Sequence, residues 1–405
     1  MLVTQPETSV PSPSSAEEEE ESPSGEVRVN LFARTDVGQV REHNEDNFLV
    51  ADLTRRTRGL LEANRATAVG PQGAVFAVCD GMGGAAAGEI ASQLAVDIIY
   101  ERLVDGLAER PIRRDELARR LVRAVETAGL RIFHEAKADR SRRGMGTTVT
   151  AAALVDEVLF FAQVGDSRGY VLRGDTLVQL TRDQSLVNQL IEAGQLTEEE
   201  AETFEHNNII LQALGTSDTV QVDLTYAELR RGDILLLCSD GLSGMVRFEE
   251  IREALRSGAE PLEICKALTE RANNAGGHDN ITVIIVRFDG TGLKPLEAET
   301  EPLKYRKYVL GDEGGEGGMA GPNSSPSGTS LGPSGSEPAM TGASNSLRPS
   351  AGAGASAWQE QGAHGAYDHD DRIDIPGTHV PIWMVVGIIF GVVVLLAGTA
   401  FLLLR

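Results

Sequence analysis

Acidic residues stand repeatedly at the ends of apolar runs that are typical of buried strands. The run from Val75 to Cys79 ends at Asp80, and a glycine-rich turn follows it. Asp-Gly alone is a common turn dipeptide, but the same arrangement recurs along the chain. The acids concerned are Glu45, Asp46, Asp80, Asp166, Asp240 and Asp279. A buried carboxylate costs free energy unless it is paired. These stretches contain too few basic residues for that, so we expect bound cations to neutralise them.

The chemistry that these acids predict is that of hard divalent cations. Carboxylates without His or Cys clusters favour Mg²⁺ or Mn²⁺, and no spacing typical of a zinc site occurs. Two such ions can hold a bridging water, lower its pKa and neutralise a phosphoryl group under in-line attack. The phosphate oxygens then need a bidentate arginine. Arg41, four residues before Glu45, is placed for this role, although its spacing is equally compatible with a surface salt bridge.

The elements that must position these residues lie between residues 27 and 289. Apolar alternation predicts short strands, and apolar residues at helical spacing predict two long helices and two shorter ones. The predicted strands are 29–33, 75–79, 147–154, 158–164, 170–173, 220–224, 233–238 and 281–288, and the predicted helices are 88–107, 115–137, 248–256 and 261–274. Strands, a helix pair, more strands and more helices predict an α+β fold, in which helices pack outside antiparallel sheets.

Composition restricts the class of protein and its compartment. The formal net charge of the 405-residue chain is −23, which argues against a general nucleic-acid-binding protein. Three cysteines give no disulfide framework, and two of them end buried runs, as small apolar residues do in a reducing compartment. The N-terminus lacks the basic and apolar regions of a signal peptide. We therefore expect the large N-terminal part to be cytoplasmic.

The flanking segments predict a tethered domain. Residues 1–26 have the composition of a disordered acidic tail, and residues 290–380 that of a disordered linker rich in Gly, Ser and Pro. Within 381–405, the stretch from Ile382 to Leu404 carries no charge and is long enough to span a bilayer. This predicts a single-pass anchor in the cell membrane. The Gly-x-x-x-Gly pair of Gly387 and Gly391 predicts a weak dimer contact between two such helices.

Six motifs occur in an order that resembles a known family. They are Arg41-Glu42-His43-Asn44-Glu45-Asp46, Asp80-Gly81-Met82-Gly83-Gly84, Gly144-Met145-Gly146-Thr147-Thr148, Val164-Gly165-Asp166-Ser167-Arg168, Cys238-Ser239-Asp240-Gly241-Leu242 and His278-Asp279-Asn280. Together they closely resemble the metal-dependent PPM (type 2C) family of serine/threonine protein phosphatases, in its bacterial form. The resemblance covers roughly residues 29–288. It implies a β-sandwich of two antiparallel sheets flanked by helix pairs, with the metal centre at one end.

The resemblance also implies a role for each site residue. Asp80 would bridge two metal ions and the Gly81 carbonyl would bind one of them. Glu45 would support the site through water, while Asp240 and Asp279 would complete it. Asp166, with Asp240, matches the third metal site of bacterial members, and Arg41 matches the phosphate-binding arginine. Residues from about 183 to 222 resemble the mobile flap beside the site.

The sequence departs from the family pattern at three places. Met82 stands where animal members carry a histidine proposed as general acid, so the leaving group must be protonated by water or another group. Gly244 stands where many members have a second aspartate, which weakens the case for a third metal at Asp166. The flap reads His206-Asn207-Asn208 where a His-Pro pattern is usual. Flap conformation and substrate choice are therefore open.

The resulting hypothesis is a Mn²⁺- or Mg²⁺-dependent phosphatase acting on phosphoserine and phosphothreonine in proteins, tethered near membrane-bound kinases or their substrates. The alternative is a non-catalytic, membrane-tethered binding or scaffold protein on the same fold. A two-metal nuclease is a third reading, which the acidic composition disfavours. Cys265 and Arg271 match the Cys-x5-Arg spacing of cysteine phosphatases, but the residues between them form a helix pattern without the glycines that a phosphate-binding loop needs.

Overall fold

The computed structural model describes residues 25–59, 66–83, 87–197, 200–201, 204, 208–298 and 301–311. The chain divides into two compact units, Met1–Ala351 and Gly352–Arg405, and every described residue belongs to the first. The predicted acidic tail (residues 1–24 of it), most of the predicted linker and the predicted membrane anchor lie outside the described residues. Within the described part of the chain, no helix combines the length and the apolar character needed to span a bilayer.

Two antiparallel sheets form the centre of the first unit, which confirms that part of the predicted fold class. The first sheet has six strands, in the order β10 (Thr176–Gln179), β9 (Arg168–Arg173), β12 (Ile234–Cys238), β13 (Ile281–Asp289), β1 (Arg28–Asp36) and β4 (Thr67–Ala68). The second follows the order β14 (Tyr305–Lys307), β11 (Asp223–Glu228), β8 (Val158–Val164), β7 (Val149–Val155), β5 (Ala74–Met82), β2 (Asp46–Asp52) and β3 (Thr57–Arg58), and the short β6 (Gly146–Thr147) pairs with the end of β5.

The alternation of side chains along each central strand supplies two cores at once. On β5, Phe76 and Val78 pack between the two sheets, whereas Val75, Ala77 and Cys79 pack on the other side of the sheet. All five are at most 1% exposed. Since successive side chains of a strand point to opposite faces, a strand covered on both faces must be apolar at every position. This is why the run before Asp80 is continuous rather than alternating.

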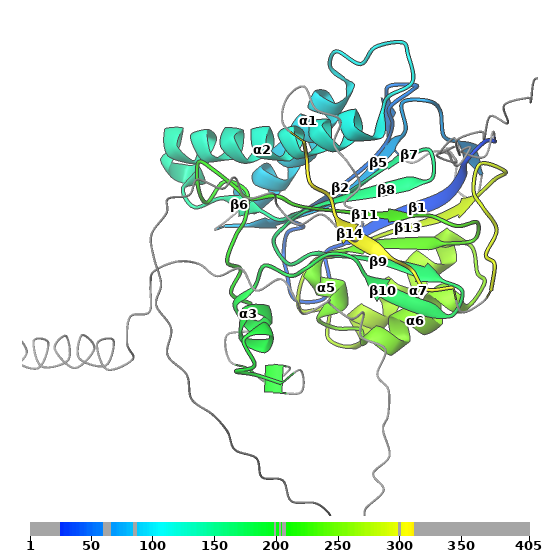
Figure 1. Cartoon of the computed structure of the whole chain (residues 1–405). Helices are drawn as coiled ribbons and strands as arrows, with labels where there is room; N and C mark the ends of the chain where they lie inside the picture. Colours follow the sequence, from blue (N-terminus) through cyan, green and yellow to red (C-terminus); the bar gives the residue numbers. More distant parts are fainter. Residues whose placement is uncertain are drawn as a thin grey trace, which may run out of the picture. The chain divides into compact units, whose positions relative to one another are not determined.

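Helices cover the outer faces of both sheets (Figure 1). α1 (Ala87–Val104) and α2 (Arg114–Ala138) share a core with the second sheet, and α6 (Phe248–Arg256) and α7 (Pro261–Asn274) share one with the first. The short elements are η1 (Arg140–Arg142), α3 (Leu186–Glu192) and α5 (Asp240–Ser243). The helical periodicity predicted α6 and α7 to the residue and α1 and α2 within three residues at each end.

The folded part of the chain runs further than the predicted boundary at residue 289. Beyond β13 the chain returns to the second sheet, where β14 pairs with β11 through Thr225–Ala227. Leu293, Leu303 and Tyr308 are at most 8% exposed. These apolar residues are too far apart in the sequence to form a periodic pattern. The Gly, Ser and Pro content of the longer stretch after residue 311 therefore led the whole segment to be predicted as linker. The predicted strand at 220–224 likewise begins later, as β11 at Asp223.

Candidate functional site

Asp80 lies near the end of β5, where its backbone is fixed by the next motif along the chain. The Asp80 N–H donates to Thr148 Oγ1 at 3.0 Å, while the Thr148 N–H and the Thr147 hydroxyl donate to the Asp80 carbonyl at 2.8 and 2.9 Å. Thr148 Oγ1 is also 2.8 Å from Ser167 Oγ. The two threonines thus hold the strand end, and they tie it to the turn that carries Asp166.

Glycines allow the Glu45 segment to approach Asp80. The Gly81 N–H donates to the Glu45 carbonyl at 3.1 Å. A Cβ on Gly81 would lie 2.3 Å from the Gly88 carbonyl oxygen, and one on Gly88 would lie 2.5 Å from Glu45 Oε2. The contact at Gly81 is with backbone, and a Cβ on Gly88 would also lie 2.8 Å from the Gly81 carbonyl carbon, so only glycine fits at these positions. The Glu45 carboxylate therefore packs directly against the turn that begins α1.

Asp240 and Asp279 meet through their neighbours. Gly241 approaches Asn280 so closely that a Cβ there would lie 2.1 Å from the Asn280 carbonyl oxygen. The side chain of Asn280 accepts from the Glu45 N–H at 2.8 Å, and so joins the Asp279 turn to the Glu45 segment. Arg41 Nη2 donates to Asp279 Oδ2 at 2.7 Å, with half of the arginine side chain exposed. The structure thus brings the Arg41 guanidinium next to the Asp279 carboxylate.

Asp46 is a functional candidate that the sequence analysis counted among the strand-end acids but to which it assigned no role in the site. It lies opposite Asp80 in the β2–β5 register and is 4% exposed. Its Oδ2 accepts from Ser239 Oγ at 2.8 Å and from Thr282 Oγ1 at 2.7 Å, whereas its Oδ1 has no partner among the described residues. The signal was present in the sequence, because Asp46 belongs to the Arg41–Asp46 motif and begins an apolar run.

The acids act on one another electrostatically. Burial, followed by the charges of Asp46, Asp240, Asp166 and Asp279, holds the pKa of Asp80 well above its usual range. Burial raises the pKa of Asp46 and of Asp166 to about 7, with the charge of Asp240 adding to both. Like charges in a low-dielectric site disfavour simultaneous ionisation. Five carboxyl groups from five separate segments therefore lie close to one another.

This acid cluster, Asp46, Asp80, Asp166, Asp240 and Asp279, fits divalent cations. The buried oxygens Asp46 Oδ1, Asp166 Oδ1 and Asp240 Oδ1 have no hydrogen-bond partner within the described residues. Orphaned buried acceptors are rare, and a cation satisfies them while cancelling the repulsion. Among the described residues, no three His, Cys, Asp or Glu side chains already converge as a complete ligand group. Oxygen shells of Mg²⁺ or Mn²⁺ draw also on backbone carbonyls and waters, so convergence of side chains alone is not required.

Two of the three departures from the family pattern, at Met82 and Gly244, lie within the described residues, and the third lies there only in part. Met82 lies opposite Gly146 in the β5–β6 pair, beside the acid cluster. The Gly244 N–H donates to the Asp240 carbonyl at 2.7 Å and ends α5, so this position offers no carboxylate. The segment His206-Asn207 lies outside the described residues, while Asn208 is exposed.

Cys265 takes no part in the site. It lies within α7 and is fully buried, and burial raises the pKa of its thiol to about 12. Its Sγ contacts the Phe32 carbonyl at 3.5 Å, and Arg271 donates to the Glu250 carbonyl at 2.8 Å. The Cys-x5-Arg spacing is therefore part of a packed helix, in agreement with the interpretation from sequence.

Comparison with known proteins gives a consistent result. The family model described as protein phosphatase 2C matches residues 60–280. The protein phosphatase PhpP of Streptococcus pneumoniae is 39% identical over 261 residues, which are 64% of this chain and 98% of that protein. The crystal structure of the Mycobacterium tuberculosis serine/threonine phosphatase PstP/Ppp matches with a TM-score of 0.54 and 35% identity, covering 66% of this chain and 99% of that one.

A further solved structure bears on the acid cluster. The catalytic domain of the serine/threonine protein phosphatase PstP, in complex with two manganese ions, matches with a TM-score of 0.53 and 36% identity, covering 65% of this chain and 99% of that one. These relatives are thus matched over nearly their whole length, and the family model spans five of the six motifs. This chain belongs to the protein phosphatase 2C family, the PPM-type phosphatases, as the motifs predicted.

Proposed function

We propose that this chain hydrolyses phosphoserine and phosphothreonine in proteins with the help of two divalent cations, Mn²⁺ or Mg²⁺. The observation that carries the proposal is the cluster of buried carboxylates with unpaired oxygens at the end of β5. Relatives matched over nearly their full length are named serine/threonine phosphatases, and one related catalytic domain is described with two manganese ions.

Each cation ligand in the proposal comes from a residue whose position is fixed by packing. Asp80 would bridge the two ions, and the Gly81 carbonyl, Asp240 and Asp279 would hold them. Glu45 would act through water, because its carboxylate packs against Gly88 at the edge of the acid cluster. Asp166 with Asp240 would hold a third ion, since each has an unpaired buried oxygen. When bound, such cations lower the pKa of a water and neutralise the charge of a phosphoryl group.

The other part of the proposed mechanism belongs to the chain itself. Arg41 is half exposed and bonded to Asp279 through Nη2, which aims its guanidinium along the rim of the acid cluster. A guanidinium fork binds two phosphate oxygens at once, so Arg41 would orient the phosphoryl group over Asp80. Met82 has no proton to give, and protonation of the leaving serine or threonine oxygen falls to water or another group. We expect no covalent intermediate, because no side chain among the described residues is identified as its nucleophile.

Phosphate release from a phosphothreonine peptide tests the proposal. The full-length protein is assayed with Mn²⁺, with a chelator, and as Asp240→Asn. We expect metal-dependent turnover that the substitution abolishes. Asp105→Asn, an exposed acid just past the end of α1, is the matched control and should behave as the unsubstituted protein. Mn²⁺ binding without any turnover would favour the alternative, a binding or scaffold protein.

We also propose that residues 382–404 tether the enzyme to the cell membrane, with the catalytic domain in the cytoplasm. The support is the uncharged apolar stretch, which is long enough to span a bilayer. Such a tether would hold activity near membrane-bound kinases or their substrates. Deleting residues 379–405 should release the protein from pelleted membranes. If the shortened protein still sediments with them, the tether lies elsewhere or does not exist.

A further inference from the structure

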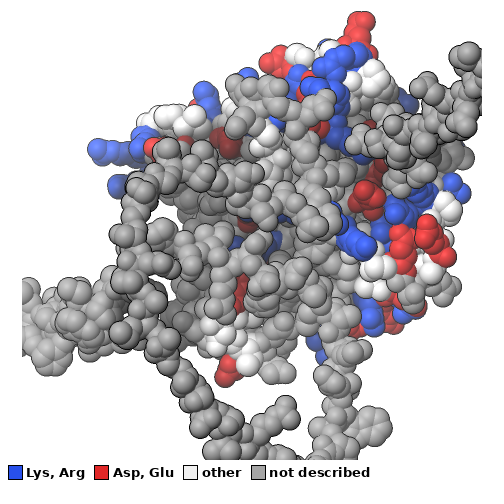
Figure 2. Space-filling model, viewed as in Figure 1, with Lys and Arg blue, Asp and Glu red and all other residues white. Residues whose placement is uncertain are grey.

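A basic segment follows the C-terminal half of α2 in this otherwise acidic protein. Residues 131–143 contain five Lys or Arg residues and two acids, whereas the whole chain has a net charge of −23. Figure 2 shows Lys and Arg side chains projecting at this end of α2. Cations in the last turn of a helix favour its dipole, which accounts for Lys137. The arginines beyond the helix end need a different explanation.

The arginines of this segment divide into paired and unpaired ones. Arg142 is fixed, since it bonds Glu135 at 3.0 Å and lies 3.6 Å from Asp139. Arg140 and Arg143 are exposed, and their side chains form no ion pair or hydrogen bond with any residue that the structure describes. We call these two residues the basic rim. An unpaired, exposed pair of cations is available to an outside ligand.

The basic rim is held in place from both sides. On one side, Asp139 Oδ1 accepts from the Ser141 N–H at 2.9 Å and so caps η1. On the other, Met145 is fully buried, two residues after Arg143. The backbone that carries Arg140 and Arg143 is therefore anchored, and their positions relative to β5 are defined.

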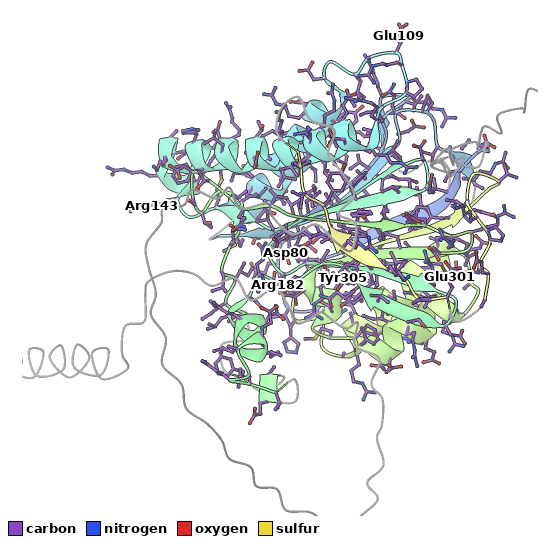
Figure 3. The ribbon with its side chains drawn as sticks, viewed as in Figure 1. Asp80, Glu109, Arg143, Arg182, Glu301 and Tyr305 are labelled. Carbon is purple, nitrogen blue, oxygen red and sulfur yellow. The ribbon has the colours of Figure 1, made fainter. Side chains whose placement is uncertain are left out.

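The anchored backbone lies against the turn that carries the acid cluster. Gly146 pairs with Met82, two residues after Asp80. A Cβ on Gly83 would lie 3.2 Å from Met145 Cα and 3.5 Å from the Gly144 carbonyl oxygen. Arg143 precedes Gly144 directly, so it stands roughly 10 Å of extended chain from the Gly146–Met82 pair. Asp80 and Arg143 are labelled in Figure 3, which has the same view as Figure 1.

We propose that the basic rim binds acidic side chains of the phosphoprotein substrate, close in sequence to the phosphoresidue. This inference rests on the proposed function and names the substrate class that the site prefers. The acid cluster would repel a substrate segment rich in Asp or Glu. Two unpaired guanidinium groups, on the segment that packs against Met82 and Gly83, would offset that repulsion for an acidic side chain bound next to them. Within a Debye length of about 8 Å their attraction survives physiological salt.

The test compares two phosphothreonine peptides that differ only in their flanks, one with Glu and the other with Gln at the same positions. The full-length protein is assayed with Mn²⁺ as the unsubstituted chain, as Arg140→Gln/Arg143→Gln, and as Arg102→Gln. Arg102 is an equally exposed arginine in the last turn of α1, roughly 22 Å along the helix from the turn at Gly83. It therefore controls for the loss of positive charge alone.

We expect the unsubstituted protein to prefer the Glu peptide in kcat/KM by about tenfold at low salt, as electrostatic steering allows. The double variant should lose this preference through KM with kcat retained, and Arg102→Gln should keep it. Added salt should reduce the preference in the unsubstituted protein. A preference that survives in the double variant, or equal losses with both peptides, would overturn the proposal.

Two further measurements distinguish this inference from the proposed function and from lipid binding. If neither peptide is hydrolysed by the unsubstituted protein, the proposed function fails, and the inference is decided by the dissociation constants of the same two peptides for the unsubstituted and double-variant proteins. If the double variant keeps the preference for the Glu peptide but loses binding to phosphatidylserine vesicles, the basic rim serves a lipid surface, and the substrate proposal is wrong.

Discussion

β12 carries one aspartate at each of its ends, and the two have opposite surroundings. Asp233 precedes the strand, and Asp240 follows it by two residues. Arg173 donates to both oxygens of Asp233, at 3.1 and 2.7 Å, and the Arg230 N–H donates at 2.8 Å. Asp240 instead lies among other acids, and its Oδ1 has no hydrogen-bond partner in the part of the chain that the structure describes. The two carboxylates are separated by roughly one strand length, about 20 Å.

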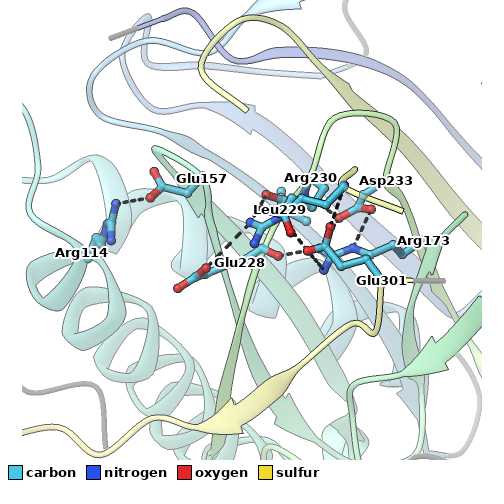
Figure 4. Close-up of polar contacts among 9 residues, drawn as sticks. Arg114, Glu157, Arg173, Glu228, Leu229, Arg230, Asp233 and Glu301 are labelled. Carbon is cyan, nitrogen blue, oxygen red and sulfur yellow. Dashed lines mark hydrogen bonds and ion pairs between the residues drawn. The ribbon is translucent and has the colours of Figure 1, made fainter. Parts of the chain in front are cut away.

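The cluster at Asp233 is closed by a segment from far along the chain (Figure 4). Glu301 Oε1 accepts from Arg230 Nε at 2.9 Å and lies 3.8 Å from Arg173 Nη1, while Arg173 also donates to the Glu228 carbonyl at 2.6 Å. Arg173 and Asp233 are 3% and 0% exposed. A buried charge with every partner present contributes to the structure, whereas a buried charge without partners awaits a ligand. This difference separates the structural end of β12 from its functional end.

The largest effect should follow from Asp240→Asn. Losing a carboxylate of the acid cluster should reduce Mn²⁺-dependent turnover by roughly a thousandfold or more. It should leave the metal-free protein as stable as before, or more stable, because it removes one of several repelling charges. Turnover with Mn²⁺ measures the loss of activity, and thermal melting in a chelator measures the stability of the metal-free protein. A strongly destabilised variant would show that Asp240 is structural after all.

Asp233→Asn should show the opposite pattern. Removing one charge of the buried pair leaves Arg173 without its counterion, which costs roughly 3–5 kcal/mol of unfolding free energy. Turnover by the fraction that remains folded should stay within a few-fold of normal, because the acid cluster is at the other end of the strand. Urea unfolding and kcat at low temperature provide the comparison. A thousandfold loss of kcat in a folded variant would remove the distinction between the two ends.

The stability of the metal-free protein should fall as pH rises from about 4 to 7. The native pKa values of Asp46 and Asp166 are about 7, above the ordinary 3.8. In this window the native carboxyls keep protons that the unfolded chain has released, so raising the pH favours unfolding, by an amount on the order of a few kcal/mol. Mn²⁺ should oppose the loss. Urea melts at pH 5.5 and 7.5 in a chelator measure it, and Asp166→Asn should flatten the difference.

Tyr308→Ala should have the smallest of these effects and tests the segment beyond β13. Tyr308 is 6% exposed and packs edge-on against Phe160 and Tyr226, with ring centroids 5.1 and 5.6 Å away. Its loss should cost about 2–3 kcal/mol of unfolding free energy, with turnover preserved in the folded protein. An unfolding free energy within error of the unsubstituted protein would return residues 301–311 to the linker.

Much of the fold is written locally in the sequence. α6, α7 and β8 have the bounds that periodicity predicted, because apolar spacing and the turn residues at each end specify a helix or strand without reference to the rest of the chain. The site motifs were legible for a related reason. Glycine is needed at positions 81 and 88 because backbone segments approach each other closely there. The hydroxyl groups at 147 and 148 form hydrogen bonds that hold the end of β5.

Only the tertiary structure decided which charges have partners. Asp233 and Asp240 flank the same apolar run. The Asp-Gly turn indicated Asp240, but no local pattern shows that Asp233 is paired, because its partner Arg173 lies 60 residues away. Glu301, which pairs with Arg173 and Arg230, lies 68 residues away. The buried place of Asp46 and the folded segment 301–311 likewise depend on contacts between segments far apart in the chain. The sequence by itself determined the fold and the family of this protein. The folded structure decided which charged side chains have partners, because charges interact through space and not along the chain.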